Sequence, residues 1–221
     1  MKLLVLSDLH GHHSIIEKFS EIDDFRKIDF LIVCGDLTHF GSLQSAEEIL
    51  KKLAALGKPV LFVPGNCDPE ALAKISEING ALNVHGRYVT IDDLSFLGIG
   101  GSTYSPFNTP FELSEEKIKE ALYHAYEERD DGKPFILISH SPPLDTRADA
   151  TSSGLHVGSR ALREFITETK PFLVVCGHIH EARGTDEVDG SLIVNPGPAH
   201  RGFYAIIEVN GRPKAEMGIL K

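Results

Sequence analysis

The sequence predicts an α/β fold, and two observations lead to this class. Short runs of apolar, often β-branched residues recur along the chain, and most of them end at a small cluster of Gly, Asp, Asn, His or Pro. Stretches with helical spacing of apolar residues lie between these runs, mainly in residues 1–80 and 135–180. Alternating strand and helix patterns are typical of βαβ units with buried sheets. The predicted strands are residues 2–6, 30–34, 60–63, 94–99, 135–138, 172–176, 192–194 and 203–209.

Two helical patterns occupy the first intervals between those strands. Residues 15–25 place Ile and Phe at roughly helical spacing. Residues 43–56 do so more regularly, and Gly57 follows them as a stop signal. Ser45 and Glu48 have the spacing of a capping box, in which the two side chains satisfy free N–H groups of the first turn. The sequence therefore predicts two helices before the third strand.

Three further helices are predicted from their N-terminal signals. Asp68 precedes a proline, and an Asp cap followed by Pro predicts the start of a helix over residues 70–78. Ser114 and Ser159 are predicted caps of two more helices. The final stretch, 186–220, is predicted to contain strands alone.

Length, charge and cysteine content narrow the class of protein. The chain has 221 residues, which fits one domain over residues 1–221, since a domain has about 100–200 residues. The net charge of −10 disfavours a nucleic-acid polymer as partner, because proteins that bind nucleic acids usually carry a basic face. Three scattered cysteines do not predict a disulfide framework, and no apolar run is long enough for a secretory signal or a membrane span. We therefore expect a cytoplasmic protein without membrane contact and leave a homo-oligomer open.

Side chains that can ligate metals follow five of the predicted strands. Because the carboxyl ends of parallel strands meet at one edge of a sheet, these side chains are expected to converge. A single Asp at such a position more often forms a turn or a cap, and a single His more often lies on the surface. Seven oxygen or nitrogen donors at five strand ends indicate a metal centre instead. The seven are Asp8, His10, Asp36, Asn66, His140, His178 and His180.

Seven donors predict two divalent ions that share a ligand. With about six positions around each ion, separate ligand sets cannot be filled, so water and a bridging carboxylate are expected, and Asp36 is the predicted bridge. A water or hydroxide held between ions about 3.5–4 Å apart becomes a nucleophile. The residual positive charge would attract an anionic substrate. Imidazole and oxygen ligands without thiolate favour Mn, Fe, Zn, Ni or Co, and manganese is our first choice.

The order of these motifs resembles that of the calcineurin-like metallophosphoesterase family. The resemblance spans residues 3 to about 200 and implies a four-layer αββα sandwich, in which two mixed β-sheets are flanked by helices. The matching segments are Asp8-Leu9-His10, Gly35-Asp36, Gly65-Asn66-Cys67-Asp68, His140 and Gly177-His178-Ile179-His180. The ligand sets that the resemblance implies are Asp8, His10, Asp36 and His180 for one ion, and Asp36, Asn66, His140 and His178 for the other.

One motif position departs from the family pattern. The family has His where this chain has Cys67, and in the family that histidine helps to protonate the leaving oxygen and binds phosphate. Loss of a general acid typically costs about 10²–10⁴-fold in rate, so substrates with poor leaving groups are expected to suffer most. Cys67 is either a small residue tolerated beside the metals or a proton donor itself. Small prokaryotic relatives that resemble this variant with Cys are associated with phosphodiester hydrolysis.

Three loop histidines are candidates for the missing acid. His156 lies in the polar loop 151–159, which opens a predicted helix, and a helix start can hold a phosphate oxygen. His39 follows Asp36 by three residues, and His200 follows a turn near the site, so either can line the cleft. A solvated position is the alternative for each of the three.

The sequence thus predicts a metal-dependent phosphohydrolase that acts on a small phosphoester, with a phosphodiesterase favoured. In this interpretation the metal-bridging hydroxide attacks phosphorus. The catalytic candidates are Asp36, Asn66, Cys67 and His156. A phosphomonoesterase or protein phosphatase is the alternative among enzymes. A non-catalytic scaffold that binds metal is the alternative of a different class, but such scaffolds usually lose ligands, whereas all seven are present here.

Overall fold

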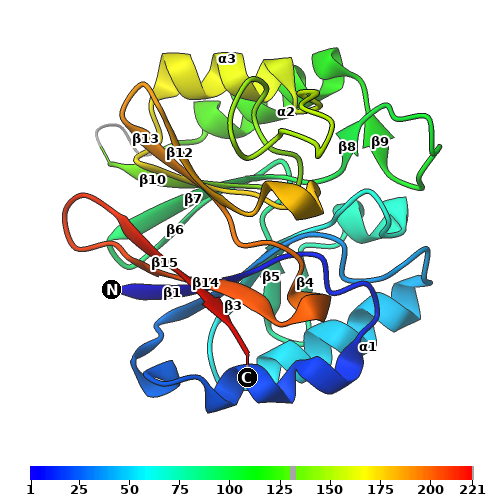
Figure 1. Ribbon diagram of the computed structural model, residues 1–221, viewed down its shortest axis with the longest axis vertical. Helices are drawn as coiled ribbons and strands as arrows, with labels where there is room; N and C mark the ends of the chain where they lie inside the picture. Colours follow the sequence, from blue (N-terminus) through cyan, green and yellow to red (C-terminus); the bar gives the residue numbers. More distant parts are fainter. Residues whose placement is uncertain (130–132, 221) are drawn as a thin grey trace.

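Two mixed β-sheets lie face to face, and helices cover their outer faces (Figure 1). The structure is a computed structural model, and it describes residues 1–129 and 133–220. The first sheet has seven strands in the order β15 (Lys214–Ile219), β14 (Phe203–Glu208), β1 (Lys2–Leu6), β2 (Phe30–Cys34), β3 (Val60–Val63), β5 (Ala81–Asn83) and β4 (Glu77–Ile78). The second has six, in the order β12 (Gly184–Val188), β13 (Ser191–Asn195), β11 (Leu173–Val175), β10 (Phe135–Ser139), β7 (Leu94–Ile99) and β6 (Tyr88–Ile91).

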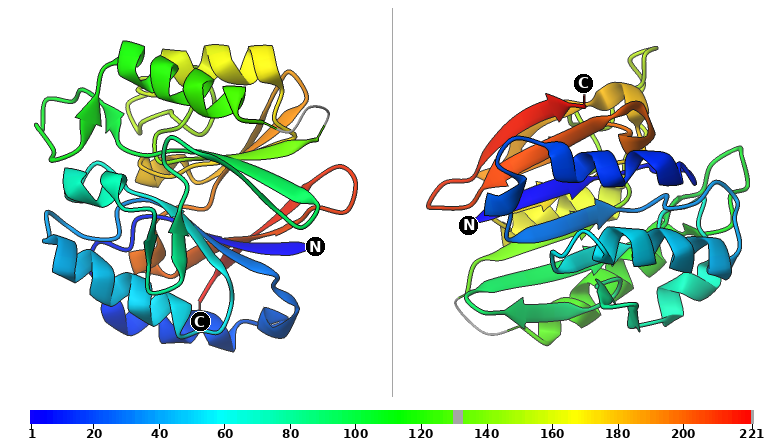
Figure 2. Two further views of the ribbon diagram at one scale, coloured as in Figure 1. Left: turned by 180° about the vertical axis from the view of Figure 1, so that it is seen from behind. Right: turned by 90° about the horizontal axis from the view of Figure 1, so that it is seen from below.

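Within the described residues, three α-helices and a small strand pair complete the layers. Helix α1 (Leu43–Ala54) lies outside the first sheet, whereas α2 (Glu115–Glu127) and α3 (Arg160–Thr169) lie outside the second (Figures 1 and 2). The strands β8 (Ser102–Thr103) and β9 (Glu112–Leu113) pair with each other at one end of the sandwich. None of the helices in the described residues is long and apolar enough to cross a membrane.

Three apolar clusters among the described residues hold the four layers together. In β1, Leu4 and Leu6 pack toward the helices, whereas Leu3 and Val5 pack between the two sheets. In β10, Ile138 packs between the sheets and Leu137 packs toward α2 and α3. Successive side chains of a strand point to opposite faces, so these central strands need apolar residues at every position. The continuous apolar runs in the sequence have this cause, and the predicted four-layer αββα architecture is confirmed.

The helix starts were predicted with mixed success. The Ser114 and Ser159 side chains accept hydrogen bonds from the N–H groups of the third residue after each, as N-caps do. The predicted capping box at Ser45 and Glu48 is wrong, because the N-cap of α1 lies three residues before Ser45. Its cap is Ser42, whose hydroxyl accepts a hydrogen bond from the Ser45 N–H at 3.2 Å.

Two predicted helices are not α-helices. The predicted helix over residues 15–25 is replaced by three short 3₁₀ helices: η1 (His13–Ile15), η2 (Glu17–Glu21) and η3 (Phe25–Lys27). The predicted helix over residues 70–78 is a 3₁₀ turn, η4 (Glu70–Lys74), followed by the edge strand β4. In both segments a few buried apolar side chains anchor the chain to the sheet, and 3₁₀ turns suffice to bring them there.

Asp68 is not a helix cap, which corrects the sequence prediction. Its carboxylate is fully buried and accepts hydrogen bonds from the N–H groups of Gly65, Leu37 and Thr38, at 2.8, 3.1 and 2.7 Å. These bonds connect the loop after β3 to the loop after β2. The 3₁₀ turn η4 has no side-chain cap.

Candidate metal centre

The seven predicted ligands follow the carboxyl ends of five parallel strands from the two sheets. The strands β1, β2 and β3 run parallel in the first sheet, and β10 and β11 run parallel in the second. Hydrogen bonds connect the segments that follow them: the Asp8 N–H donates to Gly35 O at 3.0 Å, and the Gly177 N–H donates to His140 O at 3.0 Å. The ligand-bearing turns of each sheet are therefore held together by their backbones.

Four of the seven predicted ligands have positive φ angles, which residues other than glycine rarely adopt. The φ angles of Asp8, His10, Asp36 and His178 are 57°, 46°, 50° and 67°. Residues other than glycine seldom occupy this left-handed region, and such strain persists only where the surroundings enforce it. Of the twelve such residues in the described part of the chain, four are strand-end donors at this one edge of the sandwich, which supports a functional role for the edge.

The glycines before the ligands allow close approach of the turns. A side chain at Gly35 would meet His140 Nδ1 at 2.5 Å and the Gly65 backbone at 2.7 Å. A side chain at Gly65 would overlap the backbone N and the carboxylate of Asp36. Glycine at these two positions thus lets the turns after β2 and β3 touch, and His140 from the other sheet reaches them.

The carboxylates and imidazoles form two overlapping groups. Potential ligand atoms of Asp8, His10 and His180 lie within 4.8 Å of one another, and so do those of Asp8, Asp36 and His140. Asp8 belongs to both groups. Asp36 of the second group also approaches the first, because its Oδ1 is 3.4 Å from His140 Nε2 and its Oδ2 is 3.6 Å from His10 Nε2.

Asn66 and His178 complete the set of seven. The side-chain Oδ1 of Asn66 lies 2.7 Å from His140 Nε2. The His178 N–H donates to Asp8 Oδ2 at 3.2 Å, and the His178 ring centroid lies 5.0 Å from that of His140. The structure thus brings all seven predicted ligands together.

The polar atoms in this site fit divalent cations. His140 Nδ1 lies 2.7 Å from the Cys34 carbonyl, to which it donates, so a neutral His140 ring directs a lone pair at Asn66 Oδ1. Two acceptors at 2.7 Å need a cation or a proton between or beside them. His10 Nε2 and His180 Nε2 lie 3.3 Å apart, and buried Asp8 Oδ1 accepts no hydrogen bond among the described residues. A divalent cation would satisfy these atoms.

Burial and mutual charge shift the pKa values of the site. Burial raises the pKa of Asp36 to about 7, and the charge of Asp8 adds to this effect. Burial alone would raise the pKa of Asp8, but the close contact with the His180 ring and the charges of His140 and His180 hold it well below its usual value. Burial lowers the pKa of His10 to about 4 and that of His178 to about 3. These two imidazoles are therefore neutral at pH 7, which is the form that binds metals.

The sequence comparisons identify the family. The family model of the calcineurin-like phosphoesterases matches residues 1–182. The chain is a calcineurin-like phosphoesterase. A probable cyclic nucleotide phosphodiesterase of Rhodopseudomonas palustris is 30% identical over 162 residues, which cover 69% of this phosphoesterase and 57% of that relative. An uncharacterized protein of Methanocaldococcus jannaschii is 40% identical over 205 residues, which cover 90% of the chain and 88% of that protein.

Solved structures agree on the fold. A crystal structure from Thermus thermophilus matches with a TM-score of 0.77 and 21% identity, and the match covers 100% of this phosphoesterase and 99% of that chain. At this level of identity the match supports the sandwich architecture alone. The metal-ligand assignments therefore depend on the geometry of the site and on the family motifs.

Cys67 stands at the motif position where the family resemblance leads us to expect histidine. Its N–H donates to Asp36 Oδ1 at 2.8 Å, and its Sγ lies 3.5 Å from Asn66 Nδ2. The side chain is nearly buried, and burial together with the charge of Asp36 raises the pKa of the thiol far above its usual value. In this state Cys67 is a thiol, not a thiolate.

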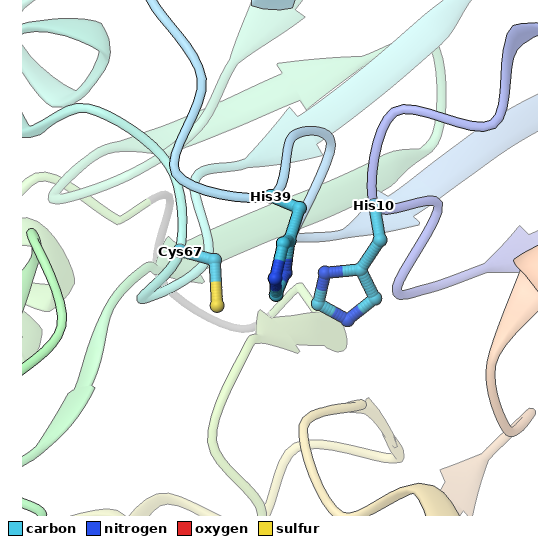
Figure 3. Close-up of side chains that lie close together, drawn as sticks. All are labelled: His10, His39 and Cys67. Atoms are coloured by element: carbon cyan, nitrogen blue, oxygen red, sulfur yellow. The ribbon is translucent and has the colours of Figure 1, made fainter. Parts of the chain in front are cut away.

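Two histidines outside the seven lie at the site. Potential ligand atoms of His39, His10 and Cys67 fall within 4.8 Å of one another, and Figure 3 shows the three side chains side by side. His200 lies 2.9 Å from the Asp8 carbonyl through Nδ1, and its ring centroid is 5.4 Å from that of His10. The spacing of His39 from Asp36 was the signal in the sequence, but only the fold shows its proximity to Cys67.

His156 belongs to a different hydrogen-bond network. Its Nδ1 lies 2.7 Å from Oδ1 of the buried Asp149, and this hydrogen bond raises the pKa of the half-exposed ring. The same carboxylate accepts hydrogen bonds from the N–H groups of Thr146 and Gly158, at 2.8 and 2.9 Å. His156 is thus anchored within its own loop, and its role as a catalytic acid stays a prediction.

Proposed function

We propose that this phosphoesterase uses two divalent ions to hydrolyse small phosphodiesters. The observation that carries the proposal is the position of Asp36, whose Oδ1 lies 3.4 Å from His140 Nε2 and whose Oδ2 lies 3.6 Å from His10 Nε2. A carboxylate in this position is suited to bridge two ions, with one oxygen on each. Bound ions of this kind supply Lewis acidity and an activated water for attack at phosphorus.

The side chains around Asp36 would hold and orient this centre. Asp8, His10 and His180 would bind on one side, and Asn66, His140 and His178 on the other. The Cys34 carbonyl fixes the orientation of the His140 ring through Nδ1, which leaves Nε2 free to ligate. The strained turns limit the freedom of Asp8 and Asp36, so little ordering is needed when metal binds.

Phosphodiesters suit the site better than phosphomonoesters. The thiol of Cys67 replaces an imidazole that would protonate a leaving oxygen, so the site favours leaving groups that depart without strong acid assistance. The relative from Rhodopseudomonas palustris, a probable cyclic nucleotide phosphodiesterase, supports the same choice. We further propose that manganese is the ion in use and that the protein acts in the cytoplasm.

The decisive experiment compares a diester with a monoester that release the same phenolate. Metal-stripped protein with Mn²⁺ restored should hydrolyse bis-p-nitrophenyl phosphate faster than p-nitrophenyl phosphate. Faster monoester hydrolysis would favour the phosphomonoesterase alternative. Absence of activity with either substrate and several metals would favour the scaffold.

Asp36→Asn tests the bridge directly. Loss of one carboxylate charge between the two groups should lower kcat by at least about 10²-fold and reduce metal content, because a metal ligand is removed. Metal analysis and diester kinetics on the same preparation measure both effects. Full activity with full metal content would refute the bridging role.

A further inference from the structure

A third group of potential ligands lies beside the metal centre. It consists of Cys67 Sγ and the rings of His39 and His10, whose ligand atoms lie within 4.8 Å of one another. In Figure 3 the His39 ring lies between the Cys67 thiol and the His10 ring. Unlike the two groups that share Asp8, this one contains a sulfur atom and no carboxylate.

The backbone fixes the relative positions of Cys67 and His39. The Phe40 N–H donates to the Cys67 carbonyl at 3.1 Å, and the Thr38 hydroxyl donates to the same carbonyl at 3.3 Å. The buried Asp68 carboxylate, next to Cys67, accepts hydrogen bonds from the Thr38 N–H and hydroxyl at 2.7 and 2.9 Å. Residues on both sides of His39 are therefore tied to the Cys67 turn, and the pair is preorganised.

The His10 ring offers a second, independent observation. Its Nε2 lies 3.6 Å from Asp36 Oδ2 and 3.3 Å from His180 Nε2, so this nitrogen belongs to the carboxylate centre. Its Nδ1 is buried and has no hydrogen-bond partner among the described residues. Figure 3 shows Nδ1, the ring nitrogen next to the point of attachment, on the side that faces His39. A buried polar atom without a partner is unusual and calls for a ligand.

The donor types decide which ion fits. One cysteine sulfur and two imidazole nitrogens are the ligands of zinc sites, and sulfur selects thiophilic ions such as Zn²⁺ and Cd²⁺ over Mn²⁺ or Mg²⁺. Three protein ligands leave a fourth position open, and the exposed His39 leaves a path for an ion to enter. We propose that Cys67, His39 and His10 form a third cation site, specific for a thiophilic divalent ion. Binding there releases the thiol proton of Cys67 to solvent.

The two kinds of site compete for His10. A neutral imidazole carries one proton, so an ion on Nδ1 leaves that proton on Nε2, and Nε2 then cannot bind an ion at the carboxylate centre. Occupation of the third site therefore removes His10 from the centre of Asp8 and His180. A thiophilic ion at this position opposes Mn²⁺ binding, and Mn²⁺ opposes the thiophilic ion.

Absorption spectroscopy with Cd²⁺ tests the site without any measurement of activity. Metal-stripped protein should show one equivalent of Cd²⁺ with a thiolate-to-cadmium charge-transfer band. Cys67→Ser should abolish the band although Cys34 and Cys176 remain, and His39→Gln should weaken Cd²⁺ binding by at least about tenfold. A band that persists in Cys67→Ser, or an unchanged affinity in His39→Gln, would overturn the proposal.

His200→Gln provides a matched control. The ring centroids of His200 and His39 both lie 5.4 Å from that of His10, but His200 is not among the three ligands. This variant should keep the band and the Cd²⁺ affinity of the parent protein. An equal loss of Cd²⁺ affinity in both variants would show that binding depends on crowding around His10 and would contradict the assignment of His39.

Competition tests the shared histidine. Saturation with Mn²⁺ should raise the apparent Kd for Cd²⁺ at the sulfur site, whereas Cd²⁺ binding that ignores Mn²⁺ would refute the exclusion through His10. The result is independent of the proposed phosphodiesterase activity. A protein with the charge-transfer band but no hydrolytic activity would retain the third site and lose the proposed function, and the reverse outcome is equally distinguishable.

Discussion

Two loops of this phosphoesterase are each organised by one fully buried aspartate, and they differ in what the aspartate connects. Asp68 accepts hydrogen bonds from residues 3 to 31 positions away in the sequence, and all of these bonds are buried. Asp149 accepts hydrogen bonds from residues 3 to 9 positions away, and several of them are only partly buried. Asp68 therefore joins two strand ends, whereas Asp149 shapes one local loop.

The hydrogen bonds of Asp68 therefore stabilise the arrangement of two strand ends, whereas those of Asp149 stabilise the conformation of a single loop. Around Asp68, loss of a hydrogen bond would loosen the turns that carry Asp36 and Asn66, which follow different strands. Around Asp149, the same loss would loosen a loop that presents His156 near the surface. The same Asp→Asn substitution at the two positions should therefore lower the free energy of unfolding by different amounts.

Asp68→Asn is expected to have the largest effect. The amide group would face the N–H groups of Gly65 and Leu37, so two buried donors would lose their acceptor. At about 1–3 kcal/mol for each unpaired buried group, the free energy of unfolding should fall by about 2–6 kcal/mol. Urea denaturation measures the fall, and diester hydrolysis should drop with it. If Asp68→Asn is as stable as the parent protein, Asp68 does not organise the two turns.

Cys67→His changes the same turn without touching its backbone hydrogen bonds. An imidazole at this position can protonate a leaving oxygen, so kcat/KM for diesters with alkyl leaving groups should rise by about 10²-fold. Diesters of p-nitrophenol should change little, because their leaving group needs no acid. Cys67→Ser serves as the control and should leave the ratio of the two rates unchanged. A uniform change across both substrate types would argue against acid catalysis at this position.

Asp149→Asn should cost less than Asp68→Asn. The N–H groups of Asp145 and Gly158 would lose their acceptor, but both bonds are partly buried and water can replace it. A fall of about 1–2 kcal/mol in the free energy of unfolding is expected, with metal content retained. Denaturation and metal analysis of the two Asn variants in parallel test the contrast. Comparable losses in both would mean that long-range and local connections matter equally.

His156→Gln is expected to have the smallest effect and a pH signature. The hydrogen bond with Asp149 raises the pKa of His156. A raised pKa means that the pair stabilises the fold below the unfolded-state pKa of about 6.5 and loses this effect as pH rises through the folded-state pKa. The stability difference between His156→Gln and the parent should therefore be present at pH 5 to 6 and shrink toward pH 9.

The same variant tests catalysis by His156. If the His156 ring only anchors its loop, His156→Gln should leave unchanged the ratio of the hydrolysis rates of diesters with poor and with good leaving groups. A selective loss with poor leaving groups would instead establish His156 as the acid that the sequence suggested. Denaturation curves across pH and kinetics with two diesters separate these outcomes.

The convergence of the seven candidate ligands was predictable because each of them stands in a local sequence pattern. Each of the seven follows an apolar run and stands in a short motif, and the parallel strands bring these motifs to one edge. The central strands were equally predictable, since burial on both faces demands unbroken apolar runs such as residues 30–34. Serine caps at Ser114 and Ser159 also depend only on neighbouring residues.

The features that were missed depend on distant partners. Asp68 before a proline has the local pattern of a helix cap, but buried N–H groups about 30 residues earlier in the chain take its carboxylate. Residues 70–78 have too few anchors for an α-helix, and the last of them pair with β5 as an edge strand. The short strands β8 and β9 carry no apolar run at all. The proximity of His39 to Cys67 likewise arises only when the two turns meet.

The division of the centre between two sheets has a consequence for biosynthesis. His10 and His180 lie 170 positions apart, and β1 pairs on one side with β14, which begins at Phe203. Parallel pairings and contacts of this range form slowly, because a long loop must close first. A nascent chain therefore leaves the ribosome with the first candidate ligands exposed long before the last ones exist. In the proposed function, stable metal loading must wait for nearly complete synthesis, and a chain that ends early would present the edge of β1 to neighbouring molecules as an aggregation site.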